Sequence, residues 1–95
     1  MISTHVLDTA RGAPYAGMKV GLYRGDELVS ERETNADGRI SELSDETLEP
    51  GEYRLVFHVE GEFFRQVELT ITLADGHYHV PLLVSPYLCT TYRGS

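Results

Sequence analysis

The segment Val67-Glu68-Leu69-Thr70-Ile71-Thr72-Leu73 alternates apolar and polar side chains without a break. Successive side chains of a β-strand point to opposite faces, so this period of two predicts a strand with one buried face. Residues 53–59 repeat the pattern, with Tyr53, Leu55, Phe57 and Val59 on one side. Residues 18–24 do the same with Met18, Val20 and Leu22. Alternation of this kind predicts a sheet that packs on a core through one face.

Turn-forming residues separate these runs at short intervals, at 11–14, 24–26, 35–38, 49–51, 60–61 and 74–76. That spacing is typical of an antiparallel two-sheet sandwich, and it favours an all-β fold. Residues 78–84 are nearly all apolar, which predicts a strand buried on both faces, centrally or at a subunit interface. Residues 90–92 predict a last short strand, and residues 45–48 could form at most one helical turn.

Length and charge restrict the functions that the chain can have. Its 95 residues predict a single domain over 1–95, and a net charge of −7 argues against nucleic acid and anionic membranes as partners. No apolar run approaches the roughly 20 residues of a membrane span. With no signal-peptide pattern at the start and Cys89 as the one cysteine, we expect a reduced, cytoplasmic protein. A periplasmic or otherwise exported form, made from a longer precursor, stays open.

A few polar residues could carry chemistry, although each also has an ordinary structural explanation. His5 lies in a strand-like segment, Arg39 closes a turn, and His77 and His79 share one strand face. Strand histidines and turn arginines are more often surface residues, and the histidine pair has no third metal ligand near it in the sequence. Nucleotide-binding loops, Cys-x-x-Cys and the serine-hydrolase elbow are absent, which argues against dinucleotide, phosphate-loop and serine-hydrolase chemistry. Without a third ligand near the histidine pair, we expect no metal.

Taken together, these residues suit one kind of reaction. A neutral histidine moves protons near pH 7, and an arginine offers a planar fork of donors to an anionic ring or a carbonyl. Tyr92 adds a stacking ring near the C-terminus. The set fits metal-free addition of water to a small, planar, electron-poor ring.

Five stretches together carry a resemblance to a known family. They are Ser3-Thr4-His5-Val6-Leu7-Asp8-Thr9-Ala10-Arg11-Gly12 with Pro14, Thr34-Asn35-Ala36-Asp37-Gly38-Arg39, Gly51-Glu52-Tyr53-Arg54-Leu55, His77-Tyr78-His79-Val80-Pro81-Leu82-Leu83-Val84-Ser85-Pro86, and Thr91-Tyr92-Arg93-Gly94-Ser95. The chain resembles the 5-hydroxyisourate hydrolases, the enzyme branch of the transthyretin family. Transthyretin proper lacks the terminal Tyr-Arg-Gly-Ser and the residues found here at His5, Arg39 and His79.

The resemblance implies a transthyretin-like sandwich of about eight strands. It also implies a homotetramer in which two edge-paired dimers stack and form the active sites between them. The implied reaction is hydrolysis of 5-hydroxyisourate to 2-oxo-4-hydroxy-4-carboxy-5-ureidoimidazoline in urate degradation, without a cofactor. The alternatives are a transthyretin-like carrier of a small aromatic ligand and a structural protein-interaction sandwich. The proton-handling and charged residues favour the enzyme over the carrier, and the polar C-terminal motif argues against a scaffold.

The resemblance also implies roles for single residues. His5 and His79 would share proton transfer, with either as the base, and Arg39 would hold the substrate and stabilise charge on its oxygens. Tyr92 would contact the substrate ring, and Ser95 would close the pocket with its carboxylate. The tail residues Arg93 and Gly94 belong to the binding motif, with Arg93 mainly an anchor, and His77 is expected to be structural.

Two segments depart from the family pattern. Residues 57–67 are shorter than usual, with an expected tight turn at Glu60-Gly61, so we expect the family's short helix to be shortened or lost. Leu88 stands where relatives have a glycine, which puts the turn before the C-terminal tail in question. Cys89 is expected to be a packed, reduced thiol.

Overall fold

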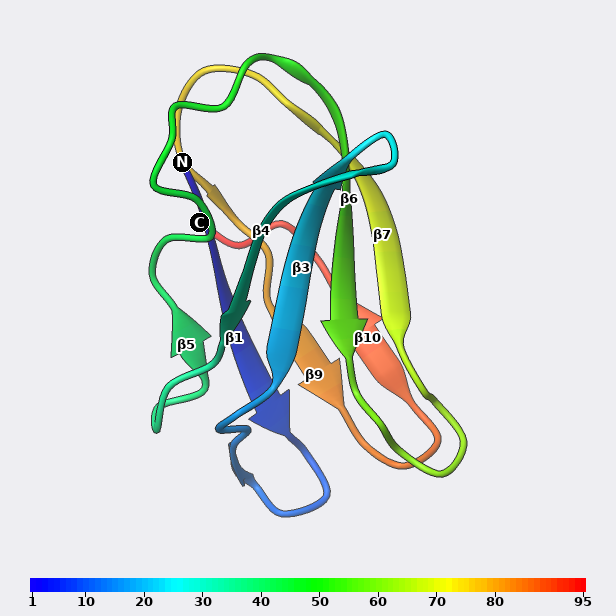
Figure 1. Ribbon diagram of the computed structural model, residues 1–95. Helices are drawn as coiled ribbons and strands as arrows, with labels where there is room; N and C mark the ends of the chain where they lie inside the picture. The colour runs from blue at the N-terminus through cyan, green and yellow to red at the C-terminus, as the bar shows by residue number, and fades with distance from the viewer.

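The computed structural model describes residues 1–95 as two β-sheets that lie against each other, with no helix (Figure 1). The first sheet is antiparallel, in the order β4-β3-β6-β7. Its strands are β3 (Lys19–Arg24), β4 (Glu27–Glu33), β6 (Gly51–His58) and β7 (Val67–Leu73). Strand β7 coincides with the predicted strand, and its side chains alternate between half-buried and exposed up to Leu73, which is buried. The predictions for 18–24 and 53–59 are confirmed to within two residues at each end.

The second sheet is built around β1 (Ile2–Asp8), which pairs with four short strands. β5 (Arg39–Ile40) and β8 (Tyr78–His79) flank its first half, while β2 (Ala13–Pro14) and β9 (Leu82–Val84) flank its second. β10 (Cys89–Thr91) pairs with β9 and ends the sheet. β8 and β9 run parallel to β1, so this sheet is only partly antiparallel.

The core lies between the two sheets and draws on both. Phe57, Leu22 and Leu55 of the first sheet and Ile2 and Leu82 of the second are fully buried there. Tyr53, Val59 and Met18 complete the apolar faces that the alternation predicts. Each sheet therefore buries one face, as period-two patterning requires.

Several details differ from the sequence predictions. The structure has ten strands, because short pairings around β1 count separately. The expected strand over 78–84 is broken into β8 and β9 at Val80-Pro81, since proline has no N–H to continue a ladder. Tyr78, His79 and Leu83 within it are only half-buried. Residues 45–46 form a bend and residues 47–48 have no regular structure, so the possible helical turn is absent.

The shortened segment between β6 and β7 closes as a tight loop, and the family helix is absent, as expected. The Glu60 N–H donates to the Arg65 carbonyl and the Gly61 N–H to the Phe64 carbonyl, at 2.9 and 3.0 Å. The chain therefore reverses at residues 62–63, two positions later than predicted. Glu60 has a φ of 55°, which is uncommon for a residue with a side chain. No helix in the molecule is long and apolar enough to cross a membrane.

Candidate active site

The outer face of β1 positions the first predicted site residue. Ile2, Thr4 and Val6 point into the core and are fully buried or nearly so. Strand geometry therefore turns Ser3 and His5 to the opposite face. His5 is half-buried there and remains open to a ligand.

Strands on both sides of β1 bring the other predicted residues to the same face. Arg39 of β5 is the pairing partner of His5, and His79 of β8 is the pairing partner of Ser3. Paired residues on neighbouring strands share a face and lie close together. The structure thus gathers His5, Arg39 and His79 from three segments far apart in the sequence.

Ser3 connects His79, which lies in β8, to His77, which precedes that strand. Its Oγ lies 2.8 Å from His79 Nδ1 and 3.0 Å from His77 Nε2, and the residue is only 7% exposed. One hydroxyl therefore lies within hydrogen-bonding distance of both rings and links His77 to His79. Sequence analysis missed Ser3, although its place two residues before His5 on a strand put it on the same face.

The C-terminal tail is held against His79. The Gly94 N–H donates to the His79 carbonyl at 2.7 Å, and the two residues form an antiparallel bridge. A Cβ on Gly94 would lie 2.7 Å from His79 Cδ2, so only glycine fits against the ring. Figure 1 shows the C-terminus ending close to the start of β1. Ser95, one residue further, is exposed beside this contact.

Arg93 and Tyr92 lie away from the histidines. The Arg93 guanidinium stacks over the Tyr78 ring, 4.3 Å from its centroid, which fits the expected anchoring role. Tyr92 is 55% exposed and lines a groove beside β7. None of His5, Arg39 and His79 lines this groove, so within one subunit Tyr92 does not share a pocket with them.

The surroundings of His79 keep its ring neutral. Burial lowers the pKa of His79 below its ordinary value of 6.5, and the charges of Arg39, His5 and His77 lower it further. A neutral imidazole can accept or donate a proton at neutral pH. A base beside a fixed guanidinium is an arrangement that can activate water and stabilise a developing oxyanion.

Comparisons with known proteins agree on one family. The model of the HIUase/transthyretin family matches residues 2–94. A Pseudomonas aeruginosa protein described as 5-hydroxyisourate hydrolase is 44% identical over 99% of this chain and 90% of its own length. The chain belongs to the HIUase/transthyretin family.

Solved structures of HIUase/transthyretin proteins support the same assignment. That of Klebsiella pneumoniae 5-hydroxyisourate hydrolase superposes with a TM-score of 0.93 and 34% identity, over 99% of this chain and 98% of the other. Sea bream transthyretin in complex with thyroxine matches 98% of this chain and 93% of its own, with a TM-score of 0.87. Its identity of 23% shows a shared fold alone. The match to the Pseudomonas protein spans 115 positions against 95 residues here, so this relative contains at least 20 positions that the present chain lacks.

The second departure from the HIUase/transthyretin pattern is accommodated without strain. Leu88 does not have a positive φ, and its carbonyl accepts hydrogen bonds from the Ser85 N–H and hydroxyl at 2.9 and 3.1 Å. The turn therefore forms with leucine, and the tail still reaches His79. Cys89 is a free thiol that packs against the core, and burial raises its pKa.

Metal ligands do not cluster in the structure. No group of three or more histidine, cysteine, aspartate or glutamate side chains is placed to hold an ion. The paired histidines His77 and His79 instead share the Ser3 hydroxyl.

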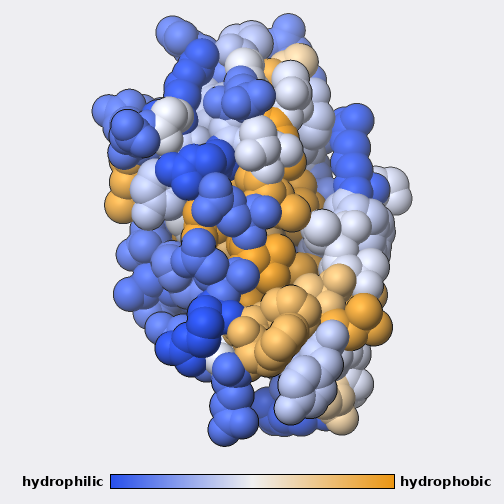
Figure 2. All heavy atoms as spheres, turned by 90° about the vertical axis from the view of Figure 1, so that its right-hand side faces the viewer, coloured by the Kyte–Doolittle hydropathy of each residue, from blue (hydrophilic) through white to orange (hydrophobic).

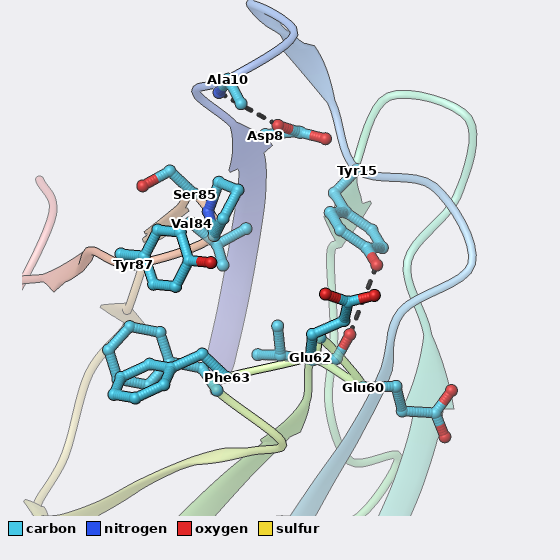
Figure 3. A pocket seen from close by; sticks show the side chains of 13 residues that line it. Asp8, Ala10, Tyr15, Glu60, Glu62, Phe63, Val84, Ser85 and Tyr87 are labelled. Carbon is cyan, nitrogen blue, oxygen red and sulfur yellow. Dashed lines mark hydrogen bonds between the residues drawn. The ribbon is translucent and has the colours of Figure 1, made fainter.

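A separate hollow of about 300 Å³ lies at the other end of β1 (Figure 3). The Phe63 and Tyr87 rings lie on one side of it, with centroids 5.7 Å apart, and Glu62 and Tyr15 lie opposite. None of the site residues predicted from the sequence lines it.

Proposed function

We propose that this chain hydrolyses 5-hydroxyisourate to 2-oxo-4-hydroxy-4-carboxy-5-ureidoimidazoline, a step of urate degradation. The observation that carries the proposal is the convergence of His5, Arg39 and His79 on one face of β1. The names and identities of the relatives support the substrate. A carrier of an aromatic ligand would have no use for a neutral histidine held beside an arginine.

The proposed chemistry is addition of water to an amide-like carbon of the six-membered ring. A histidine takes a proton from water, and the hydroxide formed attacks the ring carbon while charge develops on the carbonyl oxygen. The Arg39 guanidinium neutralises that charge. The ring C–N bond then breaks, and the leaving nitrogen receives a proton from a histidine. The neutral state of His79 supports its role as a base, with His5 as its partner.

The tail supplies the remaining part of the proposed site. Gly94 packs on the His79 ring, and Ser95 follows it directly, so its hydroxyl and carboxylate would close one side of the substrate pocket. Tyr92, in its groove beside β7, would reach substrate only in an assembly that brings a neighbouring subunit close.

We further propose that the active form is a homotetramer of two edge-paired dimers. β7 and β10 each end a sheet, and both lie on the same side of the molecule. Figure 2 shows an apolar strip down that side, and the groove there, of about 630 Å³, is lined by Leu69, Ile71, Leu73, Tyr78 and Val80. Unpaired edges beside exposed apolar surface are suited to pairing with a second copy. Stacking of two such dimers through the outer face of β1 would enclose the site.

The activity is tested by generating 5-hydroxyisourate in place from urate and urate oxidase and following the decay of its ultraviolet absorbance. We expect decay that accelerates in proportion to the concentration of this protein and is unchanged by EDTA. Decay at the spontaneous rate from a folded protein would reject the hydrolase and favour the carrier. Loss of activity in EDTA would reject a metal-free mechanism.

The assembly is tested by changing the apolar strip. Ile71→Lys places a charge in the groove, and we expect the tetramer to dissociate in analytical ultracentrifugation. Leu28→Lys is the matched control, because Leu28 is an exposed apolar residue of β4, at the other edge of the same sheet, and does not line the groove. A wild-type protein that sediments as a monomer would reject the proposed assembly.

A further inference from the structure

The Ser3 hydroxyl occupies an unusual place between two imidazole rings. Its Oγ is within hydrogen-bonding distance of His79 Nδ1 and of His77 Nε2. The side chain is buried, because the rings cover it on the outer face of β1. The neighbouring charged groups are His5 on β1, Arg39 on β5, and the C-terminal carboxylate one residue after Gly94.

Counting hydrogens shows that the three groups are coupled. A hydroxyl has one hydrogen to donate, and a neutral imidazole has one N–H and one lone pair. If Ser3 donates to His77 Nε2, then His79 Nδ1 must carry a hydrogen and donate to Ser3. In that arrangement the free Nε2 of His79 is a lone pair, which is the form of a base. If Ser3 instead donates to His79 Nδ1, then His77 Nε2–H donates to Ser3, and His79 carries its hydrogen on Nε2, which is the form of an acid.

We propose that Ser3 and His77 form a proton relay that switches His79 from base to acid during one turnover. His79 Nε2 takes a proton from water as the hydroxide bonds to the ring carbon. The Nδ1 proton of His79 passes to Ser3 Oγ, and the Ser3 proton passes to His77 Nε2. His79 is then neutral with a hydrogen on Nε2, and the positive charge rests on His77. The leaving ring nitrogen receives the Nε2 proton, and reversal of the relay restores the starting state.

The exposure of the two rings explains why such a relay is useful. Burial and the charges of Arg39, His5 and His77 lower the pKa of His79, so a positive charge on this ring is costly. His77 is exposed, and water can solvate the charge there. Ser3 and His77 would thus act through His79 as positioning residues, without contact to substrate.

This relay deepens the proposed hydrolase function and rests on it. Its kinetic test is Ser3→Ala, with His77→Gln as a second variant because His77 is exposed and its replacement spares the core. We expect kcat to fall about tenfold in either variant with KM unchanged, which is less than the loss expected for a direct acid–base group. Ser3→Thr keeps the hydroxyl and should restore most of the rate. Ser44→Ala is the matched control, since Ser44 is also buried and bonds only the Glu46 N–H.

A proton inventory in mixtures of H₂O and D₂O separates a relay from a merely structural role. For the wild type we expect a curved dependence of kcat on deuterium content, because several protons move together, and for both variants a straight line. Wild-type kcat in Ser3→Ala, or equal inventories in all the proteins, would overturn the proposal.

Nitrogen-15 NMR of the imidazole rings gives a test that needs no substrate. In the wild type, titration of His77 should change the tautomer of His79, and in Ser3→Ala the two rings should titrate independently. Independent titration in the wild type would overturn the relay. If the wild type does not accelerate decay of 5-hydroxyisourate, the hydrolase proposal fails, while this NMR measurement still decides whether Ser3 couples the rings.

Discussion

The two ends of β1 carry different kinds of surface. At its start, Ser3 and His5 share a face with polar groups from β5 and β8, and Ser3 contacts His79 within hydrogen-bonding distance. At its end, Asp8 borders the hollow between Phe63 and Tyr87. The Asp8 carboxylate already has hydrogen-bond partners there, because its Oδ1 accepts hydrogen bonds from the Ala10 and Arg11 N–H groups.

The difference shows that a deep hollow and a group of side chains able to transfer protons need not lie at the same place on a surface. The hollow of Figure 3 is the deeper surface, yet its Phe63 and Tyr87 rings are exposed and no histidine lines it. The start of β1 has imidazole rings, which can accept and donate protons, but it is open on one side in a single subunit. We expect a second copy to supply the missing wall. The following variants test whether catalysis depends only on the residues at the start of β1.

The largest expected effect is at His79. His79→Asn keeps a polar side chain near Ser3 but cannot transfer a proton, so we expect kcat to fall by about 10²- to 10⁴-fold. The decay assay measures it, and circular dichroism checks the fold. A folded variant within threefold of wild-type kcat would mean that His79 is not the acid–base group.

Arg39→Gln removes the guanidinium opposite His5. We expect a loss of about 10²- to 10³-fold in kcat/KM, as for other donors that stabilise an oxyanion. The pH profile should change as well. Arg39 lowers the pKa of His79, so without Arg39 that pKa rises, and the acidic limb of activity moves to higher pH. A limb that stays in place would show that His79 does not govern it.

The low pKa of His79 also has a consequence for stability. The unfolded chain binds a proton on His79 at a higher pH than the folded chain does, so the free energy of unfolding falls as the pH drops below 6.5. In His79→Asn this loss should shrink, and denaturant titrations at pH 7 and pH 5 measure it. If the difference in unfolding free energy between pH 7 and pH 5 is the same in the variant and the wild type, the pKa of His79 is not lowered by folding.

Gly94→Ala tests the contact between the tail and the ring. The added Cβ would overlap His79 Cδ2, so either the ring or the tail must move. We expect kcat to fall about tenfold or more, because small displacements of a reacting group are costly. The melting temperature should change little, since the tail is half-buried at most. Full activity would show that the tail adjusts without disturbing the ring.

The smallest expected effect is at the other end of β1. Phe63→Ala removes an exposed ring that stacks edge-on against Phe64, and we expect a loss of about 1 kcal/mol in unfolding free energy with activity unchanged. The same assay and a denaturant titration measure both. A tenfold loss of activity would place the hollow in the catalytic site and overturn the comparison.

Much of the fold was predictable from local pattern. The alternation over 67–73 set the bounds of β7, and the period of two correctly assigned the buried apolar residues of β3 and β6 to the core, apart from Val56. Val56 is buried although the alternation places it on the opposite face. Less regular regions were harder. Pro81 divided one expected strand into two, and the reversal after β6 came two residues later than the glycine suggested.

The candidate site was predictable only in part. His5, Arg39 and His79 were candidates from their positions in strands and a turn, and a resemblance supplied their roles. The pairing of β1 with β5 and β8 brings them together. Ser3 was missed, and His77 was assigned a structural role. Local pattern could not reveal that Ser3 contacts both rings, because the hydrogen bonds that join Ser3 to the two histidines span 74 and 76 positions.

The sequence alone determined where the regular strands lie and which of their faces are buried, because both depend on the order of side chains along a strand. It also determined the net charge, which depends on composition. Only the tertiary structure decided which strands flank β1, and therefore that one serine hydroxyl bridges two imidazoles. The alternation in a strand predicts which of its faces is buried but does not predict which strands pair with it. Parallel neighbours such as β8 are joined by long connections that leave no turn signal between the paired residues.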